Sequence, residues 1–340
     1  MKRTTLHIEN LSIGYPQRKG MPPLVVSHDI NAQLVGGEMV CLLGANGVGK
    51  STLMKTITGF LSALEGRVML NDTSIHTMNE RDISKLIAVV LTDKLQVPNA
   101  TVFEMVSYGR SPYTGFMGRL NAEDERIVTA SIERCGIAHK AQHLFSSLSD
   151  GERQKVTIAK ALAQDTPIII LDEPTAFLDL PSKVEIMQLL RSLSSTVGKS
   201  ILMSTHDLDL ALQMADKLWL VDPQKALITG TPEDLLLTNA FQALFENSGI
   251  AFDYKTGLFK VNYDTNKTLG VQGHGFEFVM LRRAFSRNGI ALVHDLADHK
   301  HWIDIKKDDP MPFRFMHHGD MLLQTHSVEE VMARYFEVCN

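Results

Sequence analysis

Residues Gly44–Ser51, with the sequence GANGVGKS, have the composition and spacing of a phosphate-binding loop. They follow an apolar run that ends at Leu43 and precede an expected helix that starts at Ser51. The glycines allow backbone N–H groups to turn toward a phosphate, and the positive end of the helix dipole faces the same group. Lys50 can supply a point charge to the β- and γ-phosphates, and Ser51 can reach Mg²⁺. The predicted nucleotide contacts in this segment are Gly44, Asn46, Gly47, Gly49, Lys50, Ser51 and Thr52.

A pair of carboxylates, Asp172 and Glu173, directly follows the apolar run Ile168–Leu171. A strand here would carry both side chains to the carboxyl edge of a sheet, where folds of alternating strands and helices bind ligands. There Asp172 can hold Mg²⁺ through a water, and Glu173 can act as the general base that polarises the attacking water. We therefore predict Glu173 and Lys50 as catalytic residues, and Ser51 and Asp172 as metal ligands.

The elements that must position these side chains alternate along the first ~235 residues. Strands buried on both faces are expected at 38–43, 167–171 and 200–204, and amphipathic helices at 151–163 and 182–194. This alternation predicts an α/β fold with a parallel sheet covered by helices. Residues 99–147 are helix-rich, with an expected loop at 109–119, and we interpret them as a helical subdomain inserted into the sheet domain.

Composition narrows the function classes. The chain has 340 residues, of which 44% are apolar and 21% charged, so a disordered chain, a collagen and a coiled coil are excluded. The 34 Lys and Arg against 39 Asp and Glu leave no basic excess, and we expect no nucleic-acid partner. Cys41, Cys135 and Cys339 lie too far apart for a disulfide framework or a zinc site. With no secretory signal and no 18-residue apolar run, a cytoplasmic protein is expected.

The segment Leu148–Gln154, LSDGERQ, resembles the LSGGQ-type signature of the ATP-binding cassette (ABC) ATPases. In that family a serine and a glycine at the head of a helix bind the γ-phosphate that the opposite subunit holds. The resemblance implies Ser149, Gly151 and Glu152 as nucleotide contacts. Asp150 stands where the family has glycine, and Glu152 stands where it has glutamine.

Further motifs follow in the order that this family shows. Asp179 matches the D-loop, His206 in Thr-His-Asp matches the catalytic switch histidine, and Tyr15 matches the aromatic residue that stacks on adenine. The resemblance covers residues ~5–235 and implies a cassette over 1–240, with ATP as nucleotide and Mg²⁺ as cofactor. It implies a P-loop NTPase (RecA-like) core with an antiparallel β subdomain and a helical subdomain at about 95–160. A guanine-specific N-K-x-D motif is absent, which argues against a GTPase.

One motif of the family is missing. The loop that joins the sheet to the helical subdomain normally offers a glutamine that touches Mg²⁺ and the attacking water. In this sequence Thr92 takes the expected position, Asp93 follows it, and Gln96 lies further along. We hypothesise that Asp93 or Thr92 takes over the contact, which makes Asp93 a further predicted metal ligand.

Residues 101–113 and 118–120 resemble the importer branch that serves ferric siderophores, haem and cobalamin. The resemblance implies a homodimer beneath two integral-membrane permease subunits, at the inner face of the cell membrane. ATP binding and hydrolysis would change the permease conformation, and a substrate-binding protein would be an indirect partner. The alternatives are a non-transport ABC ATPase and a regulatory or sensor module that uses the C-terminal residues. Partners outside this chain select the cargo, so the sequence does not name it.

Residues 245–340 fall outside the resemblance, and we expect a small accessory α+β domain there. Its expected strands lie at 258–263, 267–271, 291–294, 302–306 and 313–316, and its expected helices at 276–287 and 327–336. The pattern Ser327–Glu330 predicts a capping box at the start of the second helix. We favour a role for this domain in dimer contact or regulation.

Seven of the 13 histidines lie in these last residues. His299 and His301 are two residues apart and would share one face of a strand, with Asp295 and Asp298 nearby. A metal-sensing site is one interpretation of this group, and solvated histidines on a small domain are the other.

Overall fold

The computed structural model describes residues 4–17, 21–92, 97, 99–115, 118–222, 227–241, 250–253, 258–296 and 299–339. The chain divides into two compact units, Met1–Leu244 and Phe245–Asn340, and each is described by itself. Within the described ranges, no helix combines the length and the apolar character needed to cross a bilayer.

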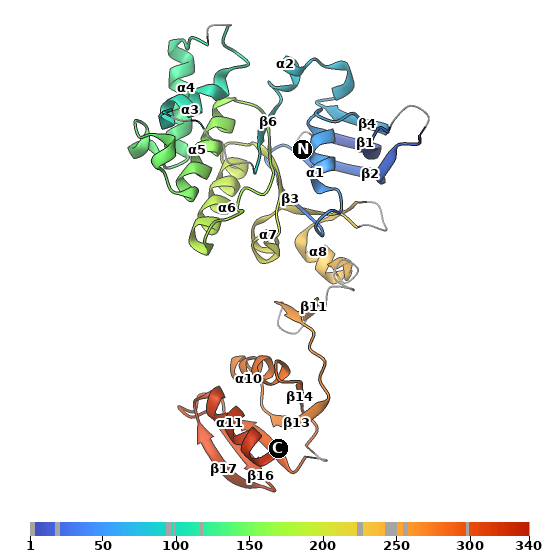
Figure 1. Ribbon diagram of the computed structural model, residues 1–340, viewed down its shortest axis with the longest axis vertical. Coiled ribbons are helices and arrows are strands. Elements are labelled where there is room, and N and C mark those ends of the chain that lie inside the picture. Colours follow the sequence, from blue (N-terminus) through green and yellow to red (C-terminus); the bar gives the residue numbers. More distant parts are fainter. Residues whose placement is uncertain are drawn as a thin grey trace. The chain divides into compact units, whose positions relative to one another are not determined.

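A six-stranded sheet forms the centre of the first unit, with the strand order β10-β9-β3-β8-β7-β6. Its strands β3 and β6 are labelled in Figure 1. Five of its strands are parallel and β10 is antiparallel to β9. Their bounds are Met39–Leu43 (β3), Ile87–Val90 (β6), Ile168–Leu171 (β7), Ser200–Ser204 (β8), Lys217–Leu220 (β9) and Ile228–Gly230 (β10). Every residue of β3, β7 and β8 is buried, as expected for apolar strands covered on both faces. The predicted parallel sheet is confirmed.

The helices of this unit follow the strands. They are Lys50–Ile57 (α1), Glu80–Ile83 (α2), Leu180–Ser195 (α6), Leu208–Met214 (α7) and Pro232–Leu237 (α8). Because β3, β6, β7 and β8 run in the same direction, the loops that leave them all meet at one edge of the sheet. The segments after Leu43, Val90, Leu171 and Ser204 therefore converge there.

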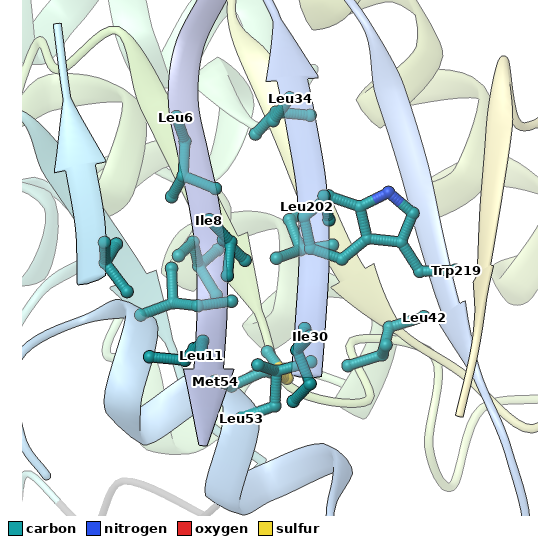
Figure 2. Close-up of a cluster of buried hydrophobic side chains, with 14 of the residues drawn as sticks. Leu6, Ile8, Leu11, Ile30, Leu34, Leu42, Leu53, Met54, Leu202 and Trp219 are labelled. Carbon is teal, nitrogen blue, oxygen red and sulfur yellow. The ribbon is translucent and has the colours of Figure 1, made fainter. Parts of the chain in front are cut away.

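A second, antiparallel sheet packs against this core, with the order β2-β1-β4-β5. Its strands are Thr4–Tyr15 (β1), Leu24–Val35 (β2), Glu65–Leu70 (β4) and Thr73–Ser74 (β5). Side chains from β1 and β2 meet side chains from α1 and the parallel sheet in one buried cluster (Figure 2). The cluster includes Leu6, Ile8, Leu11, Ile30, Leu34, Leu42, Leu53, Met54, Leu202 and Trp219. This packing holds α1, and with it the loop before α1, in a fixed position.

The helical subdomain contains Val102–Ser107 (α3), Ala122–Arg134 (α4) and Asp150–Ala163 (α5). Short 3₁₀ helices lie at Ile75–Thr77, Tyr108–Arg110, Ala138–Lys140 and Phe145–Ser147. The expected loop at 109–119 is wrong at its start, because residues 109 and 110 belong to the 3₁₀ helix Tyr108–Arg110. Arg110 is buried there, and its Nε donates to Asp124 Oδ1 at 2.9 Å. Gly109 also packs so closely that a Cβ there would lie 2.2 Å from the Lys160 carbonyl oxygen.

The second unit holds a two-stranded hairpin, Ile250–Asp253 (β11) with Leu258–Val261 (β12), and a five-stranded sheet. The sheet order is β14-β13-β15-β16-β17, and its core packs on two helices, α10 and α11. The bounds are Lys267–Gln272 (β13), Phe276–Ser286 (α10), Ile290–Val293 (β14), His301–Ile305 (β15), Phe313–His317 (β16), Asp320–Thr325 (β17) and Val328–Cys339 (α11). The hairpin strand β11 and the edge strand β17 were not expected from the sequence.

Two details of this unit differ from expectation. Only half of the predicted capping box forms: the Ser327 hydroxyl accepts from the Glu330 N–H at 3.3 Å. The Glu330 carboxylate accepts from the Thr325 hydroxyl instead, and the Ser327 N–H donates to that same hydroxyl. His299 precedes β15, whereas His301 begins it and stacks on His317 at 4.5 Å between ring centroids. Asp298 lies outside the described residues. Within the described part of the chain, no group of three or more His, Cys, Asp or Glu could hold a metal ion.

Candidate active site

The predicted phosphate loop lies between β3 and α1, at the carboxyl edge of the parallel sheet. Gly49 has a φ of 111°, and a Cβ there would come within 2.6 Å of the Val26 side chain, so this position requires glycine. Gly47 has a φ of 77°, and a Cβ there would meet nothing within 4 Å. The open space over Gly47 and the absence of a capping side chain at the start of α1 leave a cradle of the kind that binds phosphate.

Lys50 is buried beneath this loop. Its Nζ donates to the carbonyl oxygens of Gly44 at 2.8 Å and Ala45 at 3.1 Å. Burial lowers the pKa of the Lys50 ammonium, and the carboxylates of Glu173 and Asp172 act in the opposite direction. The electrostatic influence of both carboxylates places Lys50 near the other half of the predicted site.

Tyr15, at the end of β1, approaches α1 from the antiparallel sheet. Its hydroxyl lies 3.2 Å from the Thr52 Oγ1, and the residue keeps 42% of its surface exposed. Thr52 itself is buried, while Ser51 and Asn46 are exposed. The structure thus gathers the predicted residues of the loop, α1 and Tyr15 around one end of a helix.

The Asp172–Glu173 pair follows β7 as predicted, and His206 follows β8 beside it. The His206 Nε2 lies 2.7 Å from Glu173 Oε1. Asp207, the next residue, is held by two contacts: its carboxylate lies 3.3 Å from Lys183 Nζ and also caps α7. These contacts fix the main chain directly after His206. The side chains of Glu173 and His206 are both partly exposed, so a water or a ligand can reach them.

The buried hydroxyl of Ser204 joins the two carboxylate residues. It donates to Asp172 Oδ1 at 2.7 Å and accepts from the Glu173 N–H at 2.8 Å. Sequence reasoning missed Ser204, because a serine at the end of an apolar strand carries no motif. Ser204 could have been found from the register of the parallel pair β7 and β8, which sets it beside Asp172.

The position of the missing glutamine is partly described. The Thr92 hydroxyl donates to the main-chain carbonyl oxygen of Asp172 at 2.7 Å, so Thr92 fixes the end of β7. Asp93 and Gln96 lie outside the described residues. The assignment of a metal contact to Asp93 stays a prediction.

The predicted signature residues lie at the start of α5. Ser149 and Glu152 form a capping box, in which the Ser149 Oγ accepts from the Glu152 N–H at 3.3 Å and the Glu152 carboxylate accepts from the Ser149 N–H at 2.9 Å. These bonds hold the pKa of Glu152 below its usual range. The two residues that depart from the family pattern have cationic neighbours, because Lys140 lies 3.6 Å from Glu152 and Arg153 lies 3.6 Å from Asp150.

Asp179 lies at the start of α6, next to the signature helix. Its carboxylate accepts from the Ser182 N–H at 3.1 Å, and hydrogen bonding with the Ser182 side chain, followed by this N–H, lowers the pKa of Asp179. A Cβ at Gly151 would lie 3.2 Å from the Ser182 hydroxyl, so α5 and α6 start side by side. Among the described residues, no hydrogen bond or ion pair joins Ser149, Gly151 or Glu152 to the phosphate loop.

Comparison with known proteins identifies the family. Residues 27–176 match the family model described as ABC transporter. An ABC transporter ATP-binding protein of Methanocaldococcus jannaschii is 39% identical over 256 residues, which are 75% of this chain and 86% of the relative. The chain belongs to the ABC transporter family. It is an ATPase of the ABC type, with the P-loop NTPase cassette that the sequence predicted.

Two further relatives of this ABC ATPase carry more specific names. The iron(3+)-hydroxamate import ATP-binding protein FhuC of Bacillus subtilis is 38% identical over 242 residues, 71% of this chain and 88% of the relative. The cobalamin import ATP-binding protein BtuD of Halobacterium salinarum is 33% identical over 234 residues, 68% of this chain and 58% of the relative.

Solved structures show the same cassette. A metal-chelate type ABC transporter in an inward-facing conformation is similar with a TM-score of 0.62 and 25% identity, over 76% of this chain and 96% of that chain. A dimeric cassette in a post-hydrolysis state bound to ADP and Pi has a TM-score of 0.57 and 25% identity, over 67% of this chain and 98% of that chain. In both comparisons, the matched share of this ABC ATPase is about as long as its first unit.

Proposed function

We propose that this ABC ATPase hydrolyses ATP with Glu173 as general base and drives an importer of metal chelates. The observation that carries the proposal is the convergence of the phosphate loop, the Asp172–Glu173 pair and His206 at one sheet edge, with Glu173 and His206 in contact. The names of relatives that import iron(3+)-hydroxamate and cobalamin support the cargo class.

The residues present suit a bound MgATP. The Gly47 cradle and the uncapped start of α1 suit the phosphates, and Lys50 beneath them supplies a positive charge. Ser51 and Asp172 offer oxygen atoms of the kind that Mg²⁺ prefers, and the metal would offset negative charge on the phosphate oxygens. Asn46, Gly44, Gly49 and Thr52 complete the proposed phosphate contacts, and Asp93 is a further proposed metal ligand. Tyr15 offers a half-exposed ring for adenine.

The proposed chemistry assigns one task to each protein group. Glu173 accepts a proton from the attacking water, and its geometry is set by His206, whose Nε2 contacts Oε1 at 2.7 Å. Lys50 stabilises negative charge that develops on the transferred phosphoryl group. His206 is partly exposed and can also approach the γ-phosphate, which makes it the second catalytic side chain of the proposal.

We propose that two copies of the chain complete two such sites. Within one chain the Ser149–Glu152 segment belongs to the helical subdomain, and no hydrogen bond of the described residues joins it to the phosphate loop. A second copy could present Ser149, Gly151 and Glu152, together with Asp179, to the γ-phosphate, since both groups start neighbouring helices. The dimeric cassette among the solved structures supports this arrangement.

We also propose a place and partners for the dimer. It would lie on the inner face of the cell membrane, bound to integral-membrane permease subunits, with a substrate-binding protein as an indirect partner. The accessory domain would contribute to dimer contact or regulation. The absence of a basic excess counts against nucleic acid as a partner.

Reconstituted uptake tests the importer proposal. The full chain is combined with its permease in proteoliposomes that contain ATP on the side of the ATPase, and uptake of a ferric hydroxamate and of cobalamin is measured. The Glu173→Gln variant serves as the hydrolysis-deficient control. ATP-dependent uptake of either chelate by the wild type and not by the variant supports import. ATPase activity without uptake of either chelate would favour a non-transport role or another cargo.

A further inference from the structure

We infer that Ser204 is a positioning residue for hydrolysis: its hydroxyl fixes the main chain between Asp172 and Glu173. The inference rests on the proposed role of Glu173 as general base. Ser204 lies outside the motifs that identify the family.

The register of two parallel strands brings Ser204 to the site. β7 pairs with β8 so that Ile170 is opposite Leu202, and both of these side chains belong to the buried apolar cluster. Side chains two residues apart lie on the same face of a strand. Two residues further along each strand, the same register places Asp172 beside Ser204, on that face and at the carboxyl edge of the sheet. On this face the apolar pair is thus followed by a pair of polar side chains.

The Ser204 hydroxyl bonds to both neighbouring residues of the carboxylate pair. A serine hydroxyl has one hydrogen to donate, and Ser204 gives it to Asp172 Oδ1 at 2.7 Å. Its oxygen accepts from the Glu173 N–H at 2.8 Å. Ser204 has no exposed surface, so water cannot easily substitute for either bond.

The backbone of Glu173 explains why this bond matters. Glu173 has a φ of 47°, in the left-handed region that residues with a side chain disfavour. The bond to Ser204 holds its N–H, and His206 contacts its carboxylate at 2.7 Å. The Thr92 hydroxyl meanwhile holds the carbonyl oxygen of Asp172. Glu173 is thus fixed at its backbone and at its carboxylate, and Ser204 provides the first of these two contacts.

A matched pair of serine variants tests the inference. Ser204→Ala removes both bonds, whereas Ser200→Ala removes an equally buried hydroxyl at the opposite end of β8, which accepts from Thr5 at 2.9 Å. The first measurement needs neither nucleotide nor metal: hydrogen exchange of the Glu173 amide, resolved by mass spectrometry of the full chain in EDTA. We expect exchange about tenfold faster in Ser204→Ala, as befits the loss of one buried hydrogen bond, and a change below twofold in Ser200→Ala.

The second measurement separates positioning from folding. We expect Ser204→Ala to lower kcat for ATP hydrolysis at least tenfold while the Kd for ATP in EDTA changes by less than twofold. Unchanged exchange of the Glu173 amide, a kcat within twofold of Ser200→Ala, or a matching loss of ATP binding would each overturn the inference. A wild-type chain that binds ATP without hydrolysing it would instead contradict the proposed function, and the exchange result would still decide whether Ser204 fixes Glu173.

Discussion

At the scale of single residues, the site couples a strained backbone to a pair of side chains in contact. Glu173 adopts its left-handed conformation directly after a fully buried strand, and its carboxylate meets His206 at 2.7 Å. Strain of this kind is found where a structure must aim a functional group, and neighbouring contacts sustain it. The residues on either side of His206 are held as well: the Asp207 N–H donates to the Thr205 hydroxyl, and Lys183 donates to the Asp207 carboxylate.

This contact predicts the effect of removing the histidine. His206→Ala leaves the Glu173 carboxylate without its partner and with more freedom to rotate. We expect kcat to fall by about 10²-fold or more, the range for loss of a positioned catalytic group, with little change in the affinity for ATP. Steady-state hydrolysis and equilibrium ATP binding measure the two effects. His139→Ala, at a surface 3₁₀ helix, is the matched control and should retain full activity.

At the scale of elements, a buried ion pair holds the helical subdomain together. Arg110 and Asp124 are 6% and 4% exposed, their side chains meet at 2.9 Å, and the Arg110 Nη1 donates to the Ala163 carbonyl oxygen at 2.8 Å. The pair thereby connects the segment after α3 with α4 and the end of α5. Removing one partner of such a pair leaves a buried charge uncompensated.

We therefore predict a large loss of stability from Asp124→Ala. The free energy of unfolding of the first unit should fall by about 3–5 kcal/mol, measured by urea denaturation. Glu123→Ala is the matched control, because Glu123 precedes Asp124 on the same helix and pairs with Arg126 at the surface. Its loss of stability should be much smaller, because water and salt screen an ion pair at the surface. Equal losses in the two variants would contradict the structural role of the buried pair.

The same carboxylate predicts a dependence on pH. The hydrogen bond from the Asn121 N–H, followed by the bond from Arg110, holds the pKa of Asp124 below its usual range. The carboxylate therefore stabilises the folded state fully above its unfolded pKa of about 4, and this stabilisation is lost as pH falls through the lower folded pKa. The difference in unfolding free energy between wild type and Asp124→Asn should be full at pH 6 and should shrink toward pH 3. A difference that grows on acidification would contradict this assignment.

The elements also show what the sequence can and cannot predict. The phosphate loop, β7 and β8 were predictable, because each is a contiguous pattern whose local chemistry sets its structure. The antiparallel sheet that contains the long strands β1 and β2 was predicted only from family resemblance, because these strands pair with each other at a distance in the sequence and carry register shifts that blur their alternation. The edge strand β17 was missed, although its partner β16 was predicted.

Side-chain partners were harder to predict than elements. The role of His206 was predicted from family resemblance, but its contact with Glu173 and the bonds of Ser204 were not predicted. The prediction that His299 and His301 share one face of a strand was wrong, because β15 begins only at His301. Such contacts depend on how strands pair, which a single sequence specifies weakly.

At the scale of the whole molecule, each of the two units has an apolar core of its own among the described residues. The cluster around Leu42 and Trp219 draws only on the first unit, and the cluster around Phe285 and Phe315 draws only on the second. Each unit thus has the buried surface that independent folding requires. The proposed ATP site is built from residues of the first unit alone.

Calorimetry can test this division. We predict two thermal transitions for the full chain, of which MgATP raises only the one that belongs to the first unit. At a nucleotide concentration of about 100 Kd the stabilisation is about 2.7 kcal/mol, and it should shift that transition by several degrees. Lys50→Ala, which lacks the phosphate-binding charge, should show no shift. A single transition, or a shift of both by MgATP, would show that the two units are coupled.

The rate of phosphate release from ATP, compared between the full chain and its Glu173→Gln variant, shows whether this chain hydrolyses ATP with Glu173 as base. Glutamine keeps the size of the side chain but cannot take a proton from water. We predict that kcat falls at least about 10²-fold while ATP still binds with wild-type affinity. A Glu173→Gln variant that releases phosphate within threefold of the wild-type rate would contradict the account.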